Sequence, residues 1–279
     1  MCLIALALEQ HPRYALVIAA NRDEFLHRPA AALDWWQPAR AAEPVLGGRD
    51  LQAGGTWMGL SAAGRIALLT NVRDPSRQRA TAPSRGAIVP AWLAWQQPAA
   101  EFWERTVAGG HNPFNLLARD GHDGQWWWTD DRASVPRRLG PGVYGLSNAA
   151  LDTPWPKVQR LKQALAAALA SPESLEDALF AALADATPVA DDAALPDTGI
   201  GLERERWLAP PFIRTPDARY GTRCSTLLIA ERTAAGLSAL VIERQFDAAG
   251  RAASQRRVRF ARWPAAAGEM PRVESDRLS

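Results

Sequence analysis

The sequence predicts an α+β fold in which antiparallel sheets stack on each other and helices pack outside them. Apolar, strand-like runs come in closely spaced pairs near both ends of the chain, which favours hairpins. Two segments rich in Ala and Leu, with helical periodicity, stand between these groups of strands. Strands and helices do not alternate one by one, and this pattern disfavours a parallel sheet of the Rossmann type.

Composition narrows the class of protein. The 279 residues show no internal boundary, so we expect one domain over residues 1–265 and a C-terminal tail over 266–279. The 32 basic and 30 acidic residues leave a scattered net charge of +2, which is too even to predict binding of nucleic acid or lipid headgroups from charge alone, and we expect no nucleic-acid partner. Two cysteines cannot form a disulfide framework or a cysteine-rich zinc site. Since no apolar run reaches the length of a membrane span, we expect a cytoplasmic protein without a transmembrane segment.

The chain begins with two nearly continuous apolar runs, 2–8 and 14–20, separated by His11-Pro12. Such runs are typical of buried strands, and the short break between them predicts an antiparallel hairpin. The second run leads directly into four polar residues, Asn21 to Glu24. Polar groups that end a buried strand must be solvated, be paired with other groups or take part in binding or catalysis. This segment is therefore a candidate for function.

The middle of the chain predicts further strands and the first helices. Residues 47–55 are rich in glycine and predict turns. The remaining apolar patterns predict strands at 56–61, 65–71, 114–120, 125–130 and 142–148, and short helices at 84–96 and 99–107. Turn residues between neighbouring strands favour hairpins here as well.

The C-terminal half predicts helices followed by strands. Helical periodicity extends over 155–170 and 172–184, which are split by Ser171-Pro172. Residues 186–217 contain five prolines and few periodic features, so we expect a long ordered loop or lid. The last strands are expected at 219–232, 237–246 and 254–262.

Cys2 is the first candidate for chemistry. Removal of the initiator methionine before a small residue would leave Cys2 with a free α-amine. A thiol with a reference pKa of ~8.5 would then lie beside an amine of ~7.7–8.0, so one residue would supply both nucleophile and base. The alternative is that Cys2 is a small buried residue that starts a strand.

The polar run after the second strand offers charged partners for such a thiol. Alternation along a strand directs Asn21 and Asp23 to one face, and Arg22 and Glu24 to the other. If the first two strands pair, one of these sets lies near Cys2, where a carboxylate would hold an α-ammonium and an arginine would lower a thiol pKa. The alternative is a salt-bridged strand end that contributes little stability.

Three further side chains stand at strand ends. Asn71 and Asn148 each close an apolar strand, and an amide NH₂ aimed at a developing oxyanion is worth roughly 2.7–4 kcal/mol. Arg223 begins another strand. The alternatives are asparagines that satisfy turn backbone and an ordinary surface arginine.

Other patterns disfavour common sites. The four histidines have neither metal-ligand spacing nor a haem-attachment run, so we expect no metal site. Gly47-Gly48 and Gly54-Gly55 lack the GK[ST] ending of a P-loop and predict turns instead.

A series of motifs runs along most of residues 2–230. The first are MCLIALAL, AANRDEFLHRP, GGRDLQAGGTWMGLS and LLTNVRDP. SRGAIV, NPFNLLARD, YGLSNAALDTPWPKV, LPDTGIG and YGTRCSTLLI follow. In this order they resemble the NRDE family, also called the transport and Golgi organisation family.

That family is in turn similar to N-terminal-nucleophile (Ntn) hydrolases, especially the penicillin-acylase and bile-salt-hydrolase branch. The similarity implies a four-layer αββα sandwich of two antiparallel sheets flanked by helices. It also implies a hydrolase or acyltransferase that uses a mature N-terminal cysteine to attack an amide or related acyl bond. The substrate would be a small, partly apolar acyl compound, with no metal or cofactor required.

The resemblance also implies roles for single residues. Cys2 would be the nucleophile, its own amine the base, and Asp23 the group that holds this amine. Asn71 and Asn148 would supply oxyanion contacts, and Arg223 would lie at the pocket floor near the thiol. Substrate contacts are expected from Asn21, Arg22, Glu24 and Trp57.

The sequence departs from that branch at one position. An arginine usually stands three residues before the aspartate, where this chain has Ala20. Arg22 instead adjoins Asp23 and points to the opposite face of the strand. We therefore expect Arg223 alone to supply the positive charge beside the thiol.

Members of the family are also linked to secretory-pathway and mitochondrial organisation and to haem or lipid handling. The alternative function is therefore a non-catalytic carrier that binds haem or lipid in the same pocket, lined by some of the twelve tryptophans. A scaffold whose site has lost activity is a third interpretation.

Overall fold

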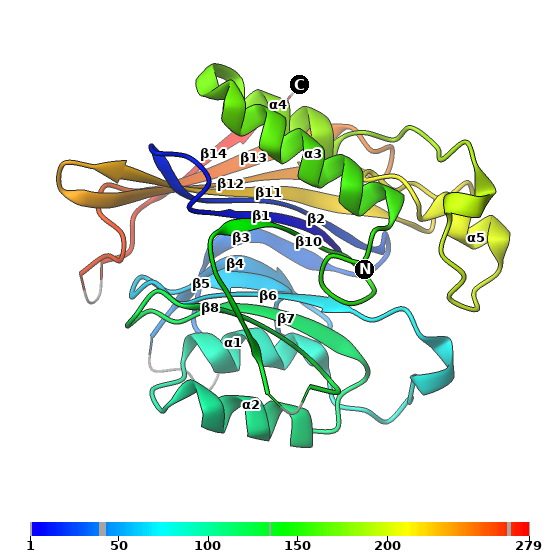
Figure 1. The fold of residues 1–279 in the computed structure, drawn as a ribbon, viewed down its shortest axis with the longest axis horizontal. Coiled ribbons are helices and arrows are strands. Elements are labelled where there is room, and N and C mark those ends of the chain that lie inside the picture. The colour runs from blue at the N-terminus through cyan, green and yellow to red at the C-terminus, as the bar shows by residue number, and fades with distance from the viewer. Residues whose placement is uncertain (1, 39–42, 134, 267–268, 279) are drawn as a thin grey trace.

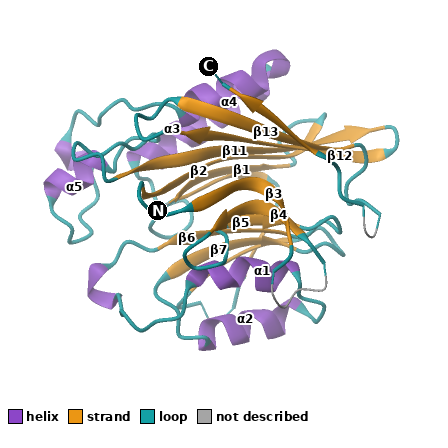
Figure 2. Ribbon diagram, turned by 180° about the vertical axis from the view of Figure 1, so that it is seen from behind, coloured by secondary structure: helices purple, strands orange, loops and turns teal. Residues whose placement is uncertain are grey.

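The computed structural model describes residues 2–38, 43–133, 135–266 and 269–278. Two antiparallel sheets lie face to face, and helices cover the outer face of each sheet (Figures 1 and 2). This αββα order of layers confirms the fold class that the sequence predicts.

Sheet A contains the hairpin at the start of the chain and the strands near its end. Cys2–Leu8 and Tyr14–Phe25 pair with each other, and the second of these strands pairs with the long strand Tyr220–Thr233. The order across sheet A is β10 (Gly142–Leu146), β1 (Cys2–Leu8), β2 (Tyr14–Phe25), β11 (Tyr220–Thr233), β12 (Gly236–Phe246), β13 (Ala252–Phe260) and β14 (Val273–Arg277).

Sheet B is formed by the middle of the chain, and its strands lie in sequence order. They are β3 (Ala30–Trp36), β4 (Val45–Asp50), β5 (Met58–Leu60), β6 (Ile66–Asn71), β7 (Phe114–Arg119), β8 (Trp126–Asp130) and β9 (Arg137–Leu139). Every pairing is antiparallel, as expected for strands joined by short connections.

The helices pack on the outer faces of the sheets. On sheet A lie α3 (Pro156–Ala170) and α4 (Leu175–Leu183), and on sheet B lie α1 (Ile88–Leu93) and α2 (Ala99–Ala108). Proline at the first position of α3 is favourable because the N–H that it lacks would have no partner within the helix. In the described ranges, no helix has both the length and the apolar composition needed to cross a membrane.

Strand alternation creates an apolar layer on each side of sheet A. In β1, Ile4, Leu6 and Leu8 face sheet B, whereas the residues between them face α3 and α4. Because both faces of the strand are covered, all seven of its residues are buried. This explains why the sequence shows a continuous apolar run here rather than an alternating pattern.

Three segments differ from the sequence expectations. The expected C-terminal tail contains β14, which pairs with β13 at the edge of sheet A, because Val273 packs against the core between the sheets. The proline-rich residues 186–217 contain a short helix, α5 (Leu202–Trp207). Part of the expected turn region 47–55 belongs to β4, where glycines allow close approach to the neighbouring strand.

Candidate active site

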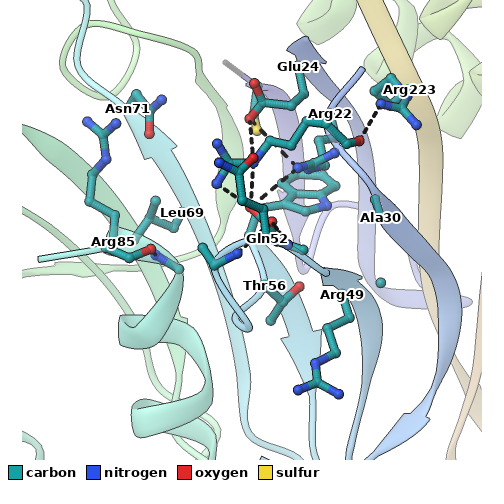
Figure 3. A pocket seen from close by; sticks show the side chains of 18 of the residues that line it. Arg22, Glu24, Ala30, Arg49, Gln52, Thr56, Leu69, Asn71, Arg85 and Arg223 are labelled. Carbon is teal, nitrogen blue, oxygen red and sulfur yellow. Dashed lines mark hydrogen bonds and ion pairs between the residues drawn. The ribbon is translucent and has the colours of Figure 1, made fainter. Parts of the chain in front are cut away.

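One end of the space between the two sheets is hollow. A cavity of about 560 Å³ lies there, with walls formed by both sheets and by the turn before α1 (Figure 3). Sheet A contributes Cys2, Arg22 and Glu24, and sheet B contributes Asp50 and Asn71. Charged and polar side chains therefore replace the apolar residues that fill the rest of this space.

Cys2 is the first residue of β1 and lies on the wall of this cavity. The alternation that places Ile4 between the sheets also directs the Cys2 thiol to this face. Burial raises the pKa of the thiol to about 11, against a smaller lowering by the charge of Arg22. The thiol therefore keeps its proton near neutral pH and needs a base before it can act as a nucleophile.

Arg22 lies directly across from Cys2 on β2, so both side chains face the cavity. Its Nη2 atom is 3.7 Å from Glu24 Oε2 and 3.9 Å from Asp50 Oδ2. The expectation that Arg223 alone supplies positive charge near the thiol is thus corrected. Arg22 and Asp23 do point to opposite faces of β2, as expected. However, the face to which Arg22 points is the one that carries the Cys2 thiol.

Asp23 borders the cavity, while its carboxyl lies on the other face of β2. Its Oδ1 atom accepts a hydrogen bond of 2.8 Å from Thr222 Oγ1, and its backbone oxygen accepts one of 2.8 Å from the Tyr220 hydroxyl. Burial raises the pKa of this carboxyl above its ordinary value. Two neighbours on β11 therefore hold Asp23 in place.

The register of β1 and β2 relates Asp23 to the backbone nitrogen of Cys2. In an antiparallel pair, moving toward the N-terminus from Cys2 corresponds to moving from Arg22 toward Asp23. The backbone nitrogen of Cys2 thus lies on the Asp23 side of the pair. Cys2 therefore presents its thiol to the cavity, while its backbone nitrogen lies on the side of the strand pair where Asp23 stands.

A β-bulge in β11 shapes the same end of sheet A. Asp23 pairs with Thr222 and Arg22 pairs with Cys224, so Arg223 is an extra residue without a partner position on β2. Because of this extra residue, Thr222 reaches Asp23 on one face while Cys224 lines the cavity on the other.

Arg223 lines the cavity, and its guanidinium is held by the backbone. Its Nη1 atom donates to three carbonyl oxygens at the end of β2 and just after it, those of Phe25, Leu26 and Arg28, at 3.1, 3.1 and 2.9 Å. Arg223 thereby fastens the turn after β2 to the bulge and still contributes a positive charge to the cavity wall.

The two asparagines are neighbours that face different spaces. Asn71 ends β6 and lines the thiol cavity (Figure 3). Asn148 is buried, and its Nδ2 atom donates a 2.8 Å hydrogen bond to the backbone oxygen of Asn71. It borders a second cavity, of about 450 Å³, instead. The expected oxyanion contact from Asn148 is therefore corrected: its amide supports the Asn71 backbone.

Three of the four expected substrate contacts line the cavity, namely Arg22, Glu24 and Trp57. Asn21 does not, because alternation places it on the face of sheet A that is covered by helices. Its Nδ2 atom donates to the backbone oxygens of Leu183 at 2.8 Å and Pro211 at 2.9 Å. Asn21 therefore joins sheet A to α4 and to the proline-rich segment rather than contacting substrate.

Arg85 is a cavity residue that the sequence reasoning missed. It begins the 3₁₀ turn Arg85–Ala87, and Ser84 Oγ accepts a 3.2 Å hydrogen bond from Gly86 N across this turn. The only sequence signal was the SRGAIV motif, which does not reveal that this turn contacts Pro113, just before β7.

Glu243 and Cys224 were also missed, and they lie together on sheet A. Glu243 Oε1 accepts hydrogen bonds of 2.6 Å from Leu33 N and from Gln245 Nε2. Burial raises the pKa of the Glu243 carboxyl and that of the Cys224 thiol. An acidic residue within the apolar run of 237–246 was the available signal.

A second group of charges lies on the helix side of Asp23. Lys157, in the first turn of α3, is buried, and burial lowers its ammonium pKa to about 8. Arg73 follows β6, lies over the Trp155 ring at 4.8 Å, and forms a buried ion pair with Glu205 of α5. This ion pair ties the proline-rich segment to the strand that ends in Asn71.

Neither cavity is arranged as a metal site within the described ranges. No cluster of three or more His, Cys, Asp or Glu side chains is gathered there in a way that could hold an ion. Cys2 and Cys224 are both free thiols on the cavity wall. The lining of the first cavity offers thiol, carboxyl, amide and guanidinium groups.

Comparison with known sequences gives a consistent result. The sequence model of a family described as Transport and Golgi organisation 2 matches residues 1–248. A Transport and Golgi organization protein 2 homolog of Bos taurus is 37% identical over 252 residues, covering 83% of this chain and 89% of its own. The Homo sapiens homolog is 33% identical with the same coverage. The Drosophila melanogaster protein is 26% identical over 258 residues, covering 83% of this chain and 88% of its own.

Solved structures include more distant matches. A Caenorhabditis elegans ortholog of N-acylethanolamine-hydrolyzing acid amidase has a TM-score of 0.43 and 11% identity, covering 82% of this chain and 92% of its own. A conjugated bile acid hydrolase from Clostridium perfringens has a TM-score of 0.40 and 11% identity, covering 85% of this chain and 91% of its own.

Proposed function

The chain belongs to the Transport and Golgi organisation 2 family, and we propose that it is a cysteine hydrolase of the Ntn type that cleaves amide bonds. The position of Cys2 carries the proposal. Its thiol faces the cavity, and its backbone nitrogen lies on the side of Asp23. Removal of Met1 would convert this nitrogen into an amine. A cavity of about 560 Å³ has the size of a site for a small molecule.

The reaction would proceed in two balanced steps. In the first, the α-amine of Cys2 takes the thiol proton, and the sulfur attacks the carbonyl carbon of the substrate. The C–N bond breaks, the proton passes to the leaving amine, and a thioester remains on Cys2. In the second, water attacks the thioester, the carboxylic acid leaves, and the thiol is restored. An acyl acceptor in place of water would give acyl transfer.

The surrounding groups support these steps. Since burial raises the thiol pKa to about 11, a base on the same residue is the shortest route for its proton. Arg22 favours the thiolate through its charge, and Asp23, on the side of the Cys2 nitrogen, would hold the ammonium. The Asn71 amide lines the cavity, where it would donate to the developing oxyanion.

Acylation by p-nitrophenyl butyrate tests the proposal. The protein is produced without an N-terminal tag, and its intact mass establishes whether Met1 is removed. We expect one equivalent of p-nitrophenolate in a burst and one butyryl group on the Cys2 peptide by mass spectrometry. Butyryl p-nitroanilide then tests cleavage of a C–N bond.

Three variants separate the proposed mechanism from general thiol reactivity. Cys2→Ala should lose the burst, whereas Cys224→Ala keeps it because Cys224 has no amine beside it. A chain extended at its N-terminus keeps the thiol but lacks the amine, and should lose the burst too. Retained Met1, or an undiminished burst in Cys2→Ala, contradicts the proposal. Saturable haem binding by Cys2→Ala, without acylation of the wild type, would favour a carrier instead.

A further inference from the structure

The arginines on the cavity wall are not all paired with carboxylates of the same wall. Five arginines line it: Arg22, Arg28, Arg49, Arg85 and Arg223. Arg28 Nη2 is 2.8 Å from Asp50, Arg22 lies between two carboxylates, and Arg223 is bound to backbone carbonyls. Arg85 forms no ion pair with any carboxylate of the described residues, and its one hydrogen bond goes to a backbone oxygen.

Arg85 is fixed in position beside Asn71. Its Nη1 atom donates a 2.9 Å hydrogen bond to the backbone oxygen of Pro113. The same oxygen accepts a 3.0 Å hydrogen bond from the backbone nitrogen of Val72, the residue after Asn71. The two donors therefore converge on one acceptor, and Figure 3 shows the Arg85 guanidinium on the same side of the cavity as the Asn71 amide.

The backbone that carries Arg85 is also held tightly. Thr56 N donates a 3.1 Å hydrogen bond to the Gly86 oxygen, and a Cβ on Gly55 would lie 2.1 Å from that oxygen. Only glycine at position 55 permits this contact between the two loops. The contact fixes the Arg85 turn against the loop before β5, so the cation is positioned before any ligand arrives.

Burial leaves the charge of Arg85 only partly compensated. It lowers the pKa of Arg85, whereas the charges of Glu24, Cys2 and Asp131 raise it. An arginine that is half-buried and without an ion pair gains most from a ligand that brings the missing negative charge.

We propose that Arg85 binds the carboxylate of the substrate beside Asn71 and Cys2, so that acyl compounds bearing a carboxylate are preferred over neutral ones. This inference rests on the proposed function for the identity of the ligand as a substrate. The binding of an anion next to the thiol can be tested without any hydrolysis.

Alkylation of Cys2 by two reagents of the same size measures this subsite directly. Iodoacetate carries a carboxylate and iodoacetamide is its neutral counterpart. The rate of each is followed on the Cys2 peptide by mass spectrometry. We expect the ratio of the iodoacetate rate to the iodoacetamide rate to fall about tenfold in Arg85→Gln, as for loss of one charged hydrogen bond. Arg49→Gln, which removes an equal charge from the same cavity, should keep the ratio within about twofold.

Protection of the wild-type protein provides a second measurement that does not depend on a variant. Hexanoate should slow the alkylation of Cys2 by iodoacetamide in a saturable manner, and hexanamide should not. An unchanged ratio in Arg85→Gln, an equal fall in Arg49→Gln, or equal protection by both compounds would overturn the inference.

The outcomes also separate the inference from the proposed function. Selective protection by hexanoate without a p-nitrophenolate burst supports the anion subsite and contradicts the hydrolase. A burst at Cys2 with no effect of charge on alkylation supports the hydrolase and contradicts the subsite.

Discussion

The two ends of the space between the sheets are built on the same strands and have opposite characters. At the closed end, Ile4 of β1 and Leu228 of β11 are buried in an apolar cluster shared by both sheets. At the open end, the same faces of the same strands carry Cys2 and Cys224, with Arg22 between them on β2. The change from polar to apolar side chains takes two residues along β1, from Cys2 to Ile4, and four along β11, from Cys224 to Leu228.

This difference shows how the fold separates stability from chemistry. Burial of a large aliphatic side chain contributes about 1.5–3 kcal/mol, whereas a buried charge costs several kcal/mol unless it is paired. The closed end therefore supplies the stability of the sandwich. The open end can hold unpaired or partly paired charges because the strands that carry them are fixed elsewhere.

The largest expected effect comes from truncating a side chain at the closed end. Leu228→Ala should lower the free energy of unfolding by about 2–5 kcal/mol, because it leaves a cavity in a close-packed cluster. Cys224→Ala, on the same face of β11, should cost about 1 kcal/mol or less because its site already borders empty space. Urea denaturation of both variants checks this, and equal losses would contradict the distinction between the two ends.

A glycine substitution tests the contact between the two loops at the open end. Gly55→Ala should cost about 1–3 kcal/mol, because its Cβ would collide with the backbone oxygen of Gly86. Gly140→Ala is the matched control, since a Cβ there meets nothing within 4 Å. Thermal unfolding measures both. A tolerated Gly55→Ala would show that the Arg85 turn is able to move.

Substitutions of Asn71 and Asn148 distinguish a residue that acts on the substrate from one that holds the backbone in place. Asn148→Ala should cost about 1–2 kcal/mol because the half-buried backbone oxygen of Asn71 loses this donor. Asn71→Ala should change stability by less than about 0.5 kcal/mol while it slows butyryl transfer to Cys2. Urea denaturation and the burst assay separate the two effects. The reverse pattern would reassign the oxyanion contact to Asn148.

The smallest expected effect concerns the pH dependence of stability. Burial raises the pKa of Glu243, so its contribution to stability is present below the ordinary carboxyl pKa and is lost as the pH rises through the folded-state value. Glu243→Gln removes this titration and keeps an oxygen for both donors. We expect the Tm of the wild type to fall relative to that of Glu243→Gln as the pH rises above the ordinary carboxyl pKa. A constant difference between the two Tm values as the pH rises would contradict the assignment.

The sequence predicted the fold well wherever periodicity was strong. The continuous apolar runs of β1 and β2 and the helical spacing in α3 and α4 identified the main layers. β3 was missed because it is a half-exposed edge strand in which only Leu33 is fully buried. β14 was missed because a charged edge strand has no apolar pattern.

The site was predicted less completely, since it depends on contacts between distant segments. Cys2, Asp23 and Asn71 could be chosen from their residue types and strand-end positions. The choice between Arg22 and Arg223 required the register of β1 against β2, which a sequence pattern does not give. Arg85 required the contact of its turn with Pro113, just before β7, which no local signal encodes.

The bulge at Arg223 determines which face of sheet A the first residues of β11 occupy. If Arg223 instead occupied a regular position opposite Asp23, Thr222 would move opposite Glu24 and share the cavity face of Cys224. Asp23 would then lose the hydroxyl that holds it. Loss of the bulge in a relative is therefore a sharper marker of a changed site than substitution of the exposed residues around it.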